Sequence, residues 1–140
     1  MAMAAARSEP QGWRATLDLG FRADPRRTVL AHRRRLGPLA VQRPFYPEGP
    51  VCHVYLLHPP GGVVGGDDLS IVARLEPGAQ ALVTTPGATK FYRSAGPLAR
   101  QSQLLEIAAD AVLEWLPQDN ILFPGARVRL DTRVDLHPGA

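Results

Sequence analysis

The sequence is poor in cysteine and lysine and has no long apolar run. Its one cysteine, Cys52, excludes an internal disulfide, so the fold does not depend on an oxidising compartment. No stretch reaches the roughly 18 apolar residues of a membrane-spanning helix. The N-terminus also lacks the apolar segment of a signal peptide. These absences predict a cytoplasmic protein with no membrane among its partners.

A long amphipathic helical pattern is missing as well. Instead, 13 glycines and 14 prolines are spread through the chain, which favours many short elements joined by turns. With 45% hydrophobic and 21% charged residues, the chain can form a packed core. The net charge of +3 is carried almost wholly by arginine. This mild basicity is weak evidence for nucleic acid, an anionic membrane surface or an acidic protein as a partner.

Alternating apolar and polar residues predict strands over most of the chain. Residues 1–12 are expected to be a disordered leader and residues 13–140 one all-β unit. The clearest strands are at 13–21 and 128–136. Shorter strands are predicted at 28–32, 39–42, 52–58, 69–75, 80–85, 90–93, 104–107 and 111–116. A single helical turn is expected within 97–105.

Three tight-turn segments are similar to one another. They occupy 75–79, 107–111 and 136–140, at spacings of 32 and 29 residues. Such a period predicts stacked β layers, as in a β-helix or solenoid, in preference to a closed barrel. Coincidence is the alternative, because Pro-Gly turns are common in β proteins. The last segment ends where a further strand is expected, so we expect the chain to be incomplete.

The most unusual segment, 58–68, places two glycine pairs around two valines and ends in two aspartates. It is not a P-loop, because Asp67 follows Gly66 where lysine is required, and it lacks the dinucleotide spacing. A structural role is the favoured interpretation: the glycine pairs permit positive φ angles or close backbone approach, and Val63 and Val64 are expected to anchor the loop in the core. The alternative is a metal site formed by Asp67, Asp68 and His58, which the Cys52 thiolate could join, since these groups suit nickel or zinc. Their spacing matches no dedicated cage, which leaves transient metal contact.

Polar and aromatic residues cluster at 84–94, and two carboxylates follow at Glu114 and Asp119. The cluster is typical of a protein interface, in which tyrosine and arginine are enriched, or of a strand with a polar outer face. A β-rich enzyme using Lys90, Glu114 or Asp119 is an alternative, although no nucleophile and base are evidently paired. The arginines at 26–35 allow nucleic-acid binding, but a charged strand edge is favoured.

Four ordered segments make the chain resemble the urease accessory protein UreD (UreH) family. They are RPFYPEG at 43–49, CHVYLLHPPGGVVGGD at 52–67, TPGATKFYRS at 85–94 and EWLPQ at 114–118. The resemblance implies an all-β ladder and a non-catalytic accessory protein in the cytoplasm. It further implies binding to the urease apoprotein and to UreF, through which the GTPase UreG joins. Nickel is expected in transit to urease, with no tightly bound cofactor and no nucleic acid.

The resemblance also suggests roles for particular residues. Asp67 is the leading candidate for a nickel channel, with His58 as a transient nickel contact. The weaker channel or partner candidates are Thr85, Lys90, Tyr92, Arg93, Ser94 and Glu114. Chains of this family are longer, so the C-terminal half is expected to be absent here. A channel or UreF surface that needs that half would then be incomplete.

Overall fold

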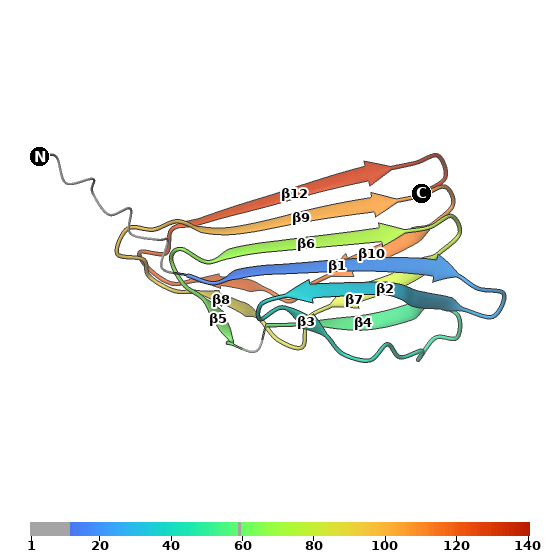
Figure 1. Cartoon of the computed structure of the whole chain (residues 1–140), viewed down its shortest axis with the longest axis horizontal. Coiled ribbons are helices and arrows are strands. Elements are labelled where there is room, and N and C mark those ends of the chain that lie inside the picture. Colours follow the sequence, from blue (N-terminus) through green and yellow to red (C-terminus); the bar gives the residue numbers. More distant parts are fainter. Residues whose placement is uncertain (1–11, 59) are drawn as a thin grey trace, which may run out of the picture.

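The computed structural model describes residues 12–58 and 60–140, and within them every regular element is a strand (Figure 1). The strands are β1 (Arg14–Ala23), β2 (Thr28–Leu36), β3 (Ala40–Val41), β4 (Cys52–Leu57), β5 (Gly62–Val63), β6 (Asp68–Leu75), β7 (Gln80–Thr84), β8 (Thr89–Phe91), β9 (Ala99–Ile107), β10 (Val112–Leu116), β11 (Asn120–Leu122) and β12 (Val128–Leu136). The all-β prediction is therefore confirmed. The predicted leader at 1–12 lies, apart from Gly12, outside the described residues.

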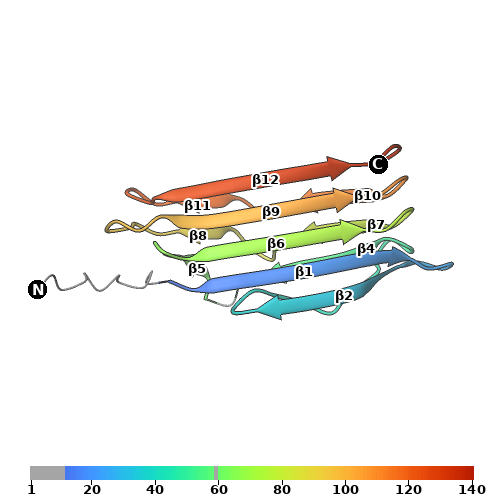
Figure 2. The ribbon, with the colours of Figure 1, turned by 45° about the horizontal axis from the view of Figure 1, so that its top comes forward.

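The strands form three sheets that are stacked as a coil (Figure 2). The long sheet has the order β12-β9-β6-β1-β2, the second sheet β10-β7-β4-β3 and the short sheet β11-β8-β5. Each turn of the coil gives one strand to each sheet: first β4, β5 and β6, then β7, β8 and β9, then β10, β11 and β12. We call each such set of three strands a rung, and the strands of neighbouring rungs pair in parallel. This is the layered, solenoid-like arrangement that the sequence predicted.

The N-terminal strands close one end of the coil. β1 continues the parallel ladder on β6, whereas β2 and β3 run antiparallel to β1 and β4. β2 is the edge of the long sheet and carries exposed arginines at 33–35. Charge on an edge strand discourages pairing with other chains, as the sequence interpretation of this arginine run favoured.

The core lies between the sheets and follows from period-two alternation. In β1, Ala15, Leu17, Leu19 and Phe21 are at most 1% exposed, while the residues between them face outward. β6 and β4 supply further buried residues, including Ile71 and Val54. Burial of each large apolar side chain stabilises the fold by about 1.5–3 kcal/mol, so this alternation holds the layers together.

The three similar turn segments stack on one another. Leu75, Ile107 and Leu136 are register neighbours across the long sheet. The turn after each contains a left-handed residue, namely Gly78 (φ 74°), Asp110 (φ 59°) and Gly139 (φ 81°). The Gly78 amide donates to Ala109 O at 3.0 Å, which links the first turn to the second. The repeat is therefore a real structural period and not a coincidence.

Two sequence predictions fail locally. The helical turn expected at 97–105 is wrong, because Ala99–Ile107 is a single strand, β9. β9 is paired on both sides, with β6 and β12, and those ladders outweigh the weak local helix signal. The short strands β5 and β11 were not predicted, because two or three residues are too few to show a period.

Candidate functional site at the interlayer cavity

A cavity of about 290 Å³ opens between the long sheet and the rest of the coil. Apolar residues from β4 and β6, including Leu56 and Ile71, form part of its wall. The polar and aromatic part of the lining comes from four separate segments, and its main members are His58, Thr85, Gln101, Gln103, Trp115 and Asn120. The cavity therefore combines an apolar wall with several hydrogen-bonding groups, as ligand-binding cavities do.

Two glutamines on β9 make the interior of the long sheet polar at this point. Gln101 and Gln103 are in phase with the buried Ala99 and Leu105, so they occupy inward positions. The Gln103 Nε2 group donates to Thr132 Oγ1 at 2.8 Å. Amides at inward strand positions are unusual, because a buried polar group requires a partner. The two glutamines at inward positions of a strand could have indicated this cavity from the sequence, but the sequence analysis did not single them out.

His58 is the predicted site residue whose state is most affected by burial. Its Nε2 atom is buried and has no hydrogen-bond partner among the described residues. Burial lowers the pKa of the imidazole, and the Asp67 carboxylate opposes that shift. At neutral pH the ring is therefore neutral, which is the form that binds metal ions. Trp115 Nε1 on the same cavity is likewise buried without a described partner.

Asp67 holds the glycine-rich loop to the start of β1. Its side chain is buried, and its Oδ1 atom accepts the Trp13 amide at 2.8 Å. Its Oδ2 atom accepts the Val64 amide at 3.0 Å. Asp67 does not line the interlayer cavity and lies instead beside a shallow pocket next to Trp13. Its contacts are those of a loop anchor that also places a negative charge near His58.

Thr85 lines the cavity and connects two loops. Its Oγ1 group donates to Gly87 O at 2.8 Å and accepts the Gln118 amide at 3.0 Å. These bonds join the turn after β7 to the segment after β10. The wall of the cavity near Thr85 is therefore fixed by hydrogen bonds to backbone from two consecutive rungs.

The glycine pairs allow two side chains of the next rung to pack directly on the backbone. A Cβ atom at Gly62 would overlap the ring of Tyr92, and one at Gly65 would lie 2.7 Å from Pro97 O and overlap Ser94 Oγ. Tyr92 also stacks on Phe123, with ring centroids 5.4 Å apart. The structural interpretation of the glycines is therefore confirmed: Gly62 and Gly65 allow close packing, and Gly61 and Gly66 have positive φ angles of 80° and 92°. Of the two valines expected to anchor the loop in the core, Val63 is buried, whereas Val64 is 46% exposed, so that expectation is wrong for Val64.

The remaining predicted residues face solvent. Lys90, Arg93 and Glu114 are exposed, and Glu114 alternates with the inward-facing Leu113 and Trp115. Among the described residues, no group of three His, Cys, Asp or Glu side chains is placed to hold a metal ion. The carboxylate Asp119 is also exposed. The residues that the enzyme alternative needs do not meet in one described pocket.

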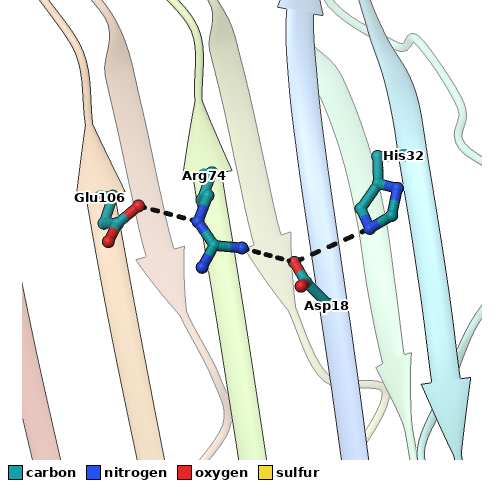
Figure 3. A network of polar contacts seen from close by, with 4 residues as sticks. All are labelled: Asp18, His32, Arg74 and Glu106. Atoms are coloured by element: carbon teal, nitrogen blue, oxygen red, sulfur yellow. Dashed lines mark hydrogen bonds and ion pairs between the residues drawn. The ribbon is translucent and has the colours of Figure 1, made fainter.

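A polar row crosses the outer face of the long sheet (Figure 3). Asp18 Oδ1 accepts from Arg74 Nη1 at 2.9 Å, and Arg74 Nε donates to Glu106 Oε2 at 2.8 Å. His32 Nε2 lies 4.0 Å from the same Asp18 oxygen. The row joins β2, β1, β6 and β9, and it could not be seen without the strand register. Exposed pairs of this kind contribute up to about 1 kcal/mol each.

The irregular proline segment 43–50 is fastened to β4 by aromatic and ionic contacts. The Phe45 ring lies 5.4 Å from the rings of Tyr55 and His53. His53 Nε2 lies 2.8 Å from Glu48 Oε2. The segment therefore has a defined position although its prolines exclude it from a sheet interior.

The family comparison decides which proteins this chain belongs with. The family model of the UreD urease accessory protein matches residues 14–140. The chain belongs to the UreD family. The recognition made from the four sequence segments is thereby confirmed.

Individual members of the UreD family show how close the similarity is. The chain is 56% identical to the urease accessory protein UreD of Enterobacter sp. (strain 638), over 94% of this chain and 48% of that protein. It is 60% identical to UreD of Klebsiella aerogenes, over 90% of this chain and 47% of that protein. With UreD of Pseudomonas putida (strain W619) it shares 59% identity, over 92% and 47%. The chain spans about half the length of the curated relatives that it matches. Across 12–58 and 60–140, the UreD fold contains no helix able to cross a membrane.

Proposed function

We propose that the chain acts in urease maturation as a non-catalytic scaffold in the cytoplasm. In this role it binds the urease apoprotein and UreF, and UreF brings the GTPase UreG to the assembly. Membership of the UreD family is the observation that carries the proposal. The relatives are named urease accessory proteins, which supports a role beside the enzyme rather than as the enzyme.

The interlayer cavity is our proposed point of passage for nickel, which is the cargo of this process. His58 offers a neutral imidazole with an unpartnered, buried Nε2 atom. Thr85, Gln101 and Gln103, whose side chains carry neutral oxygen donors, line the same cavity. One imidazole with neutral oxygen donors is a weak ligand set for nickel, which suits release better than storage.

Asp67 contributes to the same proposal through its charge. Its carboxylate interacts electrostatically with His58 and favours positive charge at the imidazole. A cation entering the cavity gains from the same field, since an uncompensated charge in a protein interior is costly. Asp67 would thus guide nickel without being a ligand in the resting loop.

We assign contact with partner proteins to four exposed residues on the last two rungs of the coil. Lys90, Tyr92 and Arg93 lie around β8, and Glu114 lies on β10. Tyr92 is 42% exposed although it is stacked on Phe123. A rigid aromatic ring beside two cations is typical of a residue group that dominates binding energy at interfaces.

A pull-down with UreF and apo-urease tests the proposed function. The bait is this chain, compared with a version extended by a full C-terminal half. We expect the extended version to retain UreF and apo-urease, and retention to fall when Lys90 and Arg93 are both changed to alanine. The matched control changes Arg22 and Arg34, which are exposed on the long sheet, and should retain both partners. If neither version captures either protein, the proposed function is wrong.

A further inference from the structure

The two halves of strand β2 differ in what covers them. β2 forms the border of the long sheet opposite β12, and among the described residues it pairs only with β1 (Figure 2). At its start, the Thr28 amide donates to Pro50 O at 2.9 Å, and the Thr28 carbonyl accepts the Tyr46 hydroxyl at 2.7 Å. The proline segment 43–50 therefore covers this part of the edge. From Ala31 onward, every residue of β2 is exposed.

Two arginines in the exposed half of β2 occupy the inward face of the sheet. Arg35 is the register partner of Leu17, which is buried on the inward face of β1. Arg33 has the same relation to Leu19. Directly opposed residues of an antiparallel pair lie on one face, so both arginines are on the core side. Inward positions of a half-buried sheet are normally apolar, which makes two arginines there unusual.

The two arginines line a pocket between β2 and β3. The pocket has a volume of about 440 Å³, and Leu17, Ala40 and Val41 form the rest of its lining. Neither Arg33 nor Arg35 forms an ion pair with any residue that the structure describes. The pocket therefore presents two positive charges, two residues apart on one face of a strand, without a carboxylate from the described chain to neutralise them.

We propose that the exposed half of β2 binds an extended acidic segment of a partner protein, which adds as a further strand. Main-chain hydrogen bonds hold a strand of this kind, and its alternate side chains determine specificity. Alternate residues of a strand share a face, so acidic residues two apart in the segment match the spacing of Arg33 and Arg35. Opposite charges that face each other across strands are stabilising.

The arginines also determine which strands are rejected. Inward-pointing charges on an edge discourage an apolar or basic strand, because that strand leaves the charges without a partner. An acidic strand neutralises them, so the same two residues exclude one class of partner and admit another. A slip of one residue would turn the carboxylates to the outer face. There Asp18, the register partner of Arg34, would repel them, so the inward register is preferred.

Fluorescence anisotropy of labelled synthetic peptides tests the proposal on this chain and on its C-terminally extended version. The probe is a short peptide of alternating glutamate and threonine, and the control peptide has lysine in place of glutamate. We expect the acidic peptide to bind both versions and the lysine peptide to bind neither. The peptides contain no part of urease or UreF, so the result is independent of the proposed function.

Substitutions in β2 locate the binding site. Arg33→Ala and Arg35→Ala should each weaken peptide binding about threefold, and the two together about tenfold. Arg34→Ala removes the same charge from the other face of the strand and is the matched control, with an expected change of at most about 1.5-fold. Circular dichroism of each variant verifies that it is folded. Unchanged binding by the double variant, or equal losses at all three positions, would overturn the proposal.

N-methylated peptides separate strand addition from attraction by charge alone. Methylation of every second amide keeps the charges but blocks hydrogen bonding along one edge of the peptide. Methylation of one edge should abolish binding, and methylation of the other edge should leave it intact. Equal affinities of the two methylated peptides, or no binding to the extended version, would contradict the proposal. Stronger displacement of the peptide by inorganic phosphate than by chloride at equal ionic strength would instead assign the pocket to a small oxyanion.

Discussion

Asp110, in the turn between β9 and β10, has a left-handed backbone conformation. Gly78 has the same conformation one rung earlier, in the turn between β6 and β7. Their φ angles are 59° and 74°. The two corners are stacked, since the Gly78 amide donates to the carbonyl of Ala109, the neighbour of Asp110. The left-handed conformation costs Gly78 no energy, because glycine has no Cβ atom, whereas it strains the backbone of Asp110.

This difference predicts opposite effects of substitution at the two corners. Asp110→Gly should raise the free energy of unfolding by up to about 1 kcal/mol, because the left-handed strain is removed. Gly78→Ala should lower it by about 1–2 kcal/mol for the reverse reason. Gly87→Ala is the control, since no atom lies within 4 Å of its added Cβ and no positive φ is imposed. Urea unfolding monitored by tryptophan fluorescence measures all three, and equal effects at positions 78 and 87 would contradict the argument.

Asp67 should be important for stability whatever its role toward nickel. Asp67→Ala leaves the Trp13 and Val64 amides without their acceptors. We expect a loss of about 2–4 kcal/mol in the free energy of unfolding, since hydrogen bonds to a charged group are worth about 1.5–3 kcal/mol each. Asp68→Ala, one residue along the chain, should cost less than 1 kcal/mol. Thermal and urea unfolding compare the two, and similar losses would show that Asp67 is not an anchor.

Gly62 and Tyr92 should behave as a coupled pair. Gly62→Ala places a methyl group where the Tyr92 ring lies, so the ring must move off Phe123. Overpacking of this kind costs about 1–3 kcal/mol. In the Tyr92→Ala background the same glycine substitution should cost much less. A double-mutant cycle measures the coupling, and strictly additive losses would mean that the two residues are not in the predicted contact.

The stability of the chain should depend on Tyr46 at high pH. Burial raises the pKa of Tyr46 to about 12, with contributions from Cys52. The Tyr46 hydroxyl donates to Thr28 O at 2.7 Å, a bond that requires the protonated form. Because the folded-state pKa is above the unfolded value, this stabilisation is complete below about pH 10 and is lost as pH rises toward 12.

Tyr46→Phe isolates this effect. The variant should be less stable than the original chain at pH 8, and it should lose less stability than the original between pH 10 and 12. Tyr55→Phe is the control, because the contact of Tyr55 with Phe45 is a stacking of the two rings, which phenylalanine preserves. Unfolding free energies measured across this pH range test the prediction, and parallel curves for Tyr46→Phe and the original chain would contradict it.

The sequence predicted those parts of the structure in which a period is repeated often enough to be recognised. The ten residues of β1 and the recurring corners at 75–79 and 136–140 identified a layered all-β fold. Short elements such as β5, with two residues, carry no period and were missed. β9 was partly mistaken for a helical turn, because only its partners on both sides reveal it as a strand.

The candidate site was predicted less completely than the fold. His58 and Thr85 were named from sequence and do line the cavity. Asp67 was also named, but it lies outside the cavity lining and binds the Trp13 amide. Gln101 and Gln103 were overlooked, because their inward direction depends on the phase of a strand that had been assigned only in part. Contacts between rungs, such as Arg74 with Asp18, depend on register between distant segments and cannot be seen in one chain segment.

Activation of apo-urease with a defined nickel supply tests the central claim most directly. UreF, UreG, apo-urease and the C-terminally extended version of this chain are combined, and nickel bound to urease is measured together with urease activity. The account predicts that omitting the chain, or changing His58 to alanine, lowers nickel incorporation, while changing the exposed His137 to alanine does not. Full nickel incorporation in the absence of the chain, or equal incorporation with both histidine variants, would contradict it.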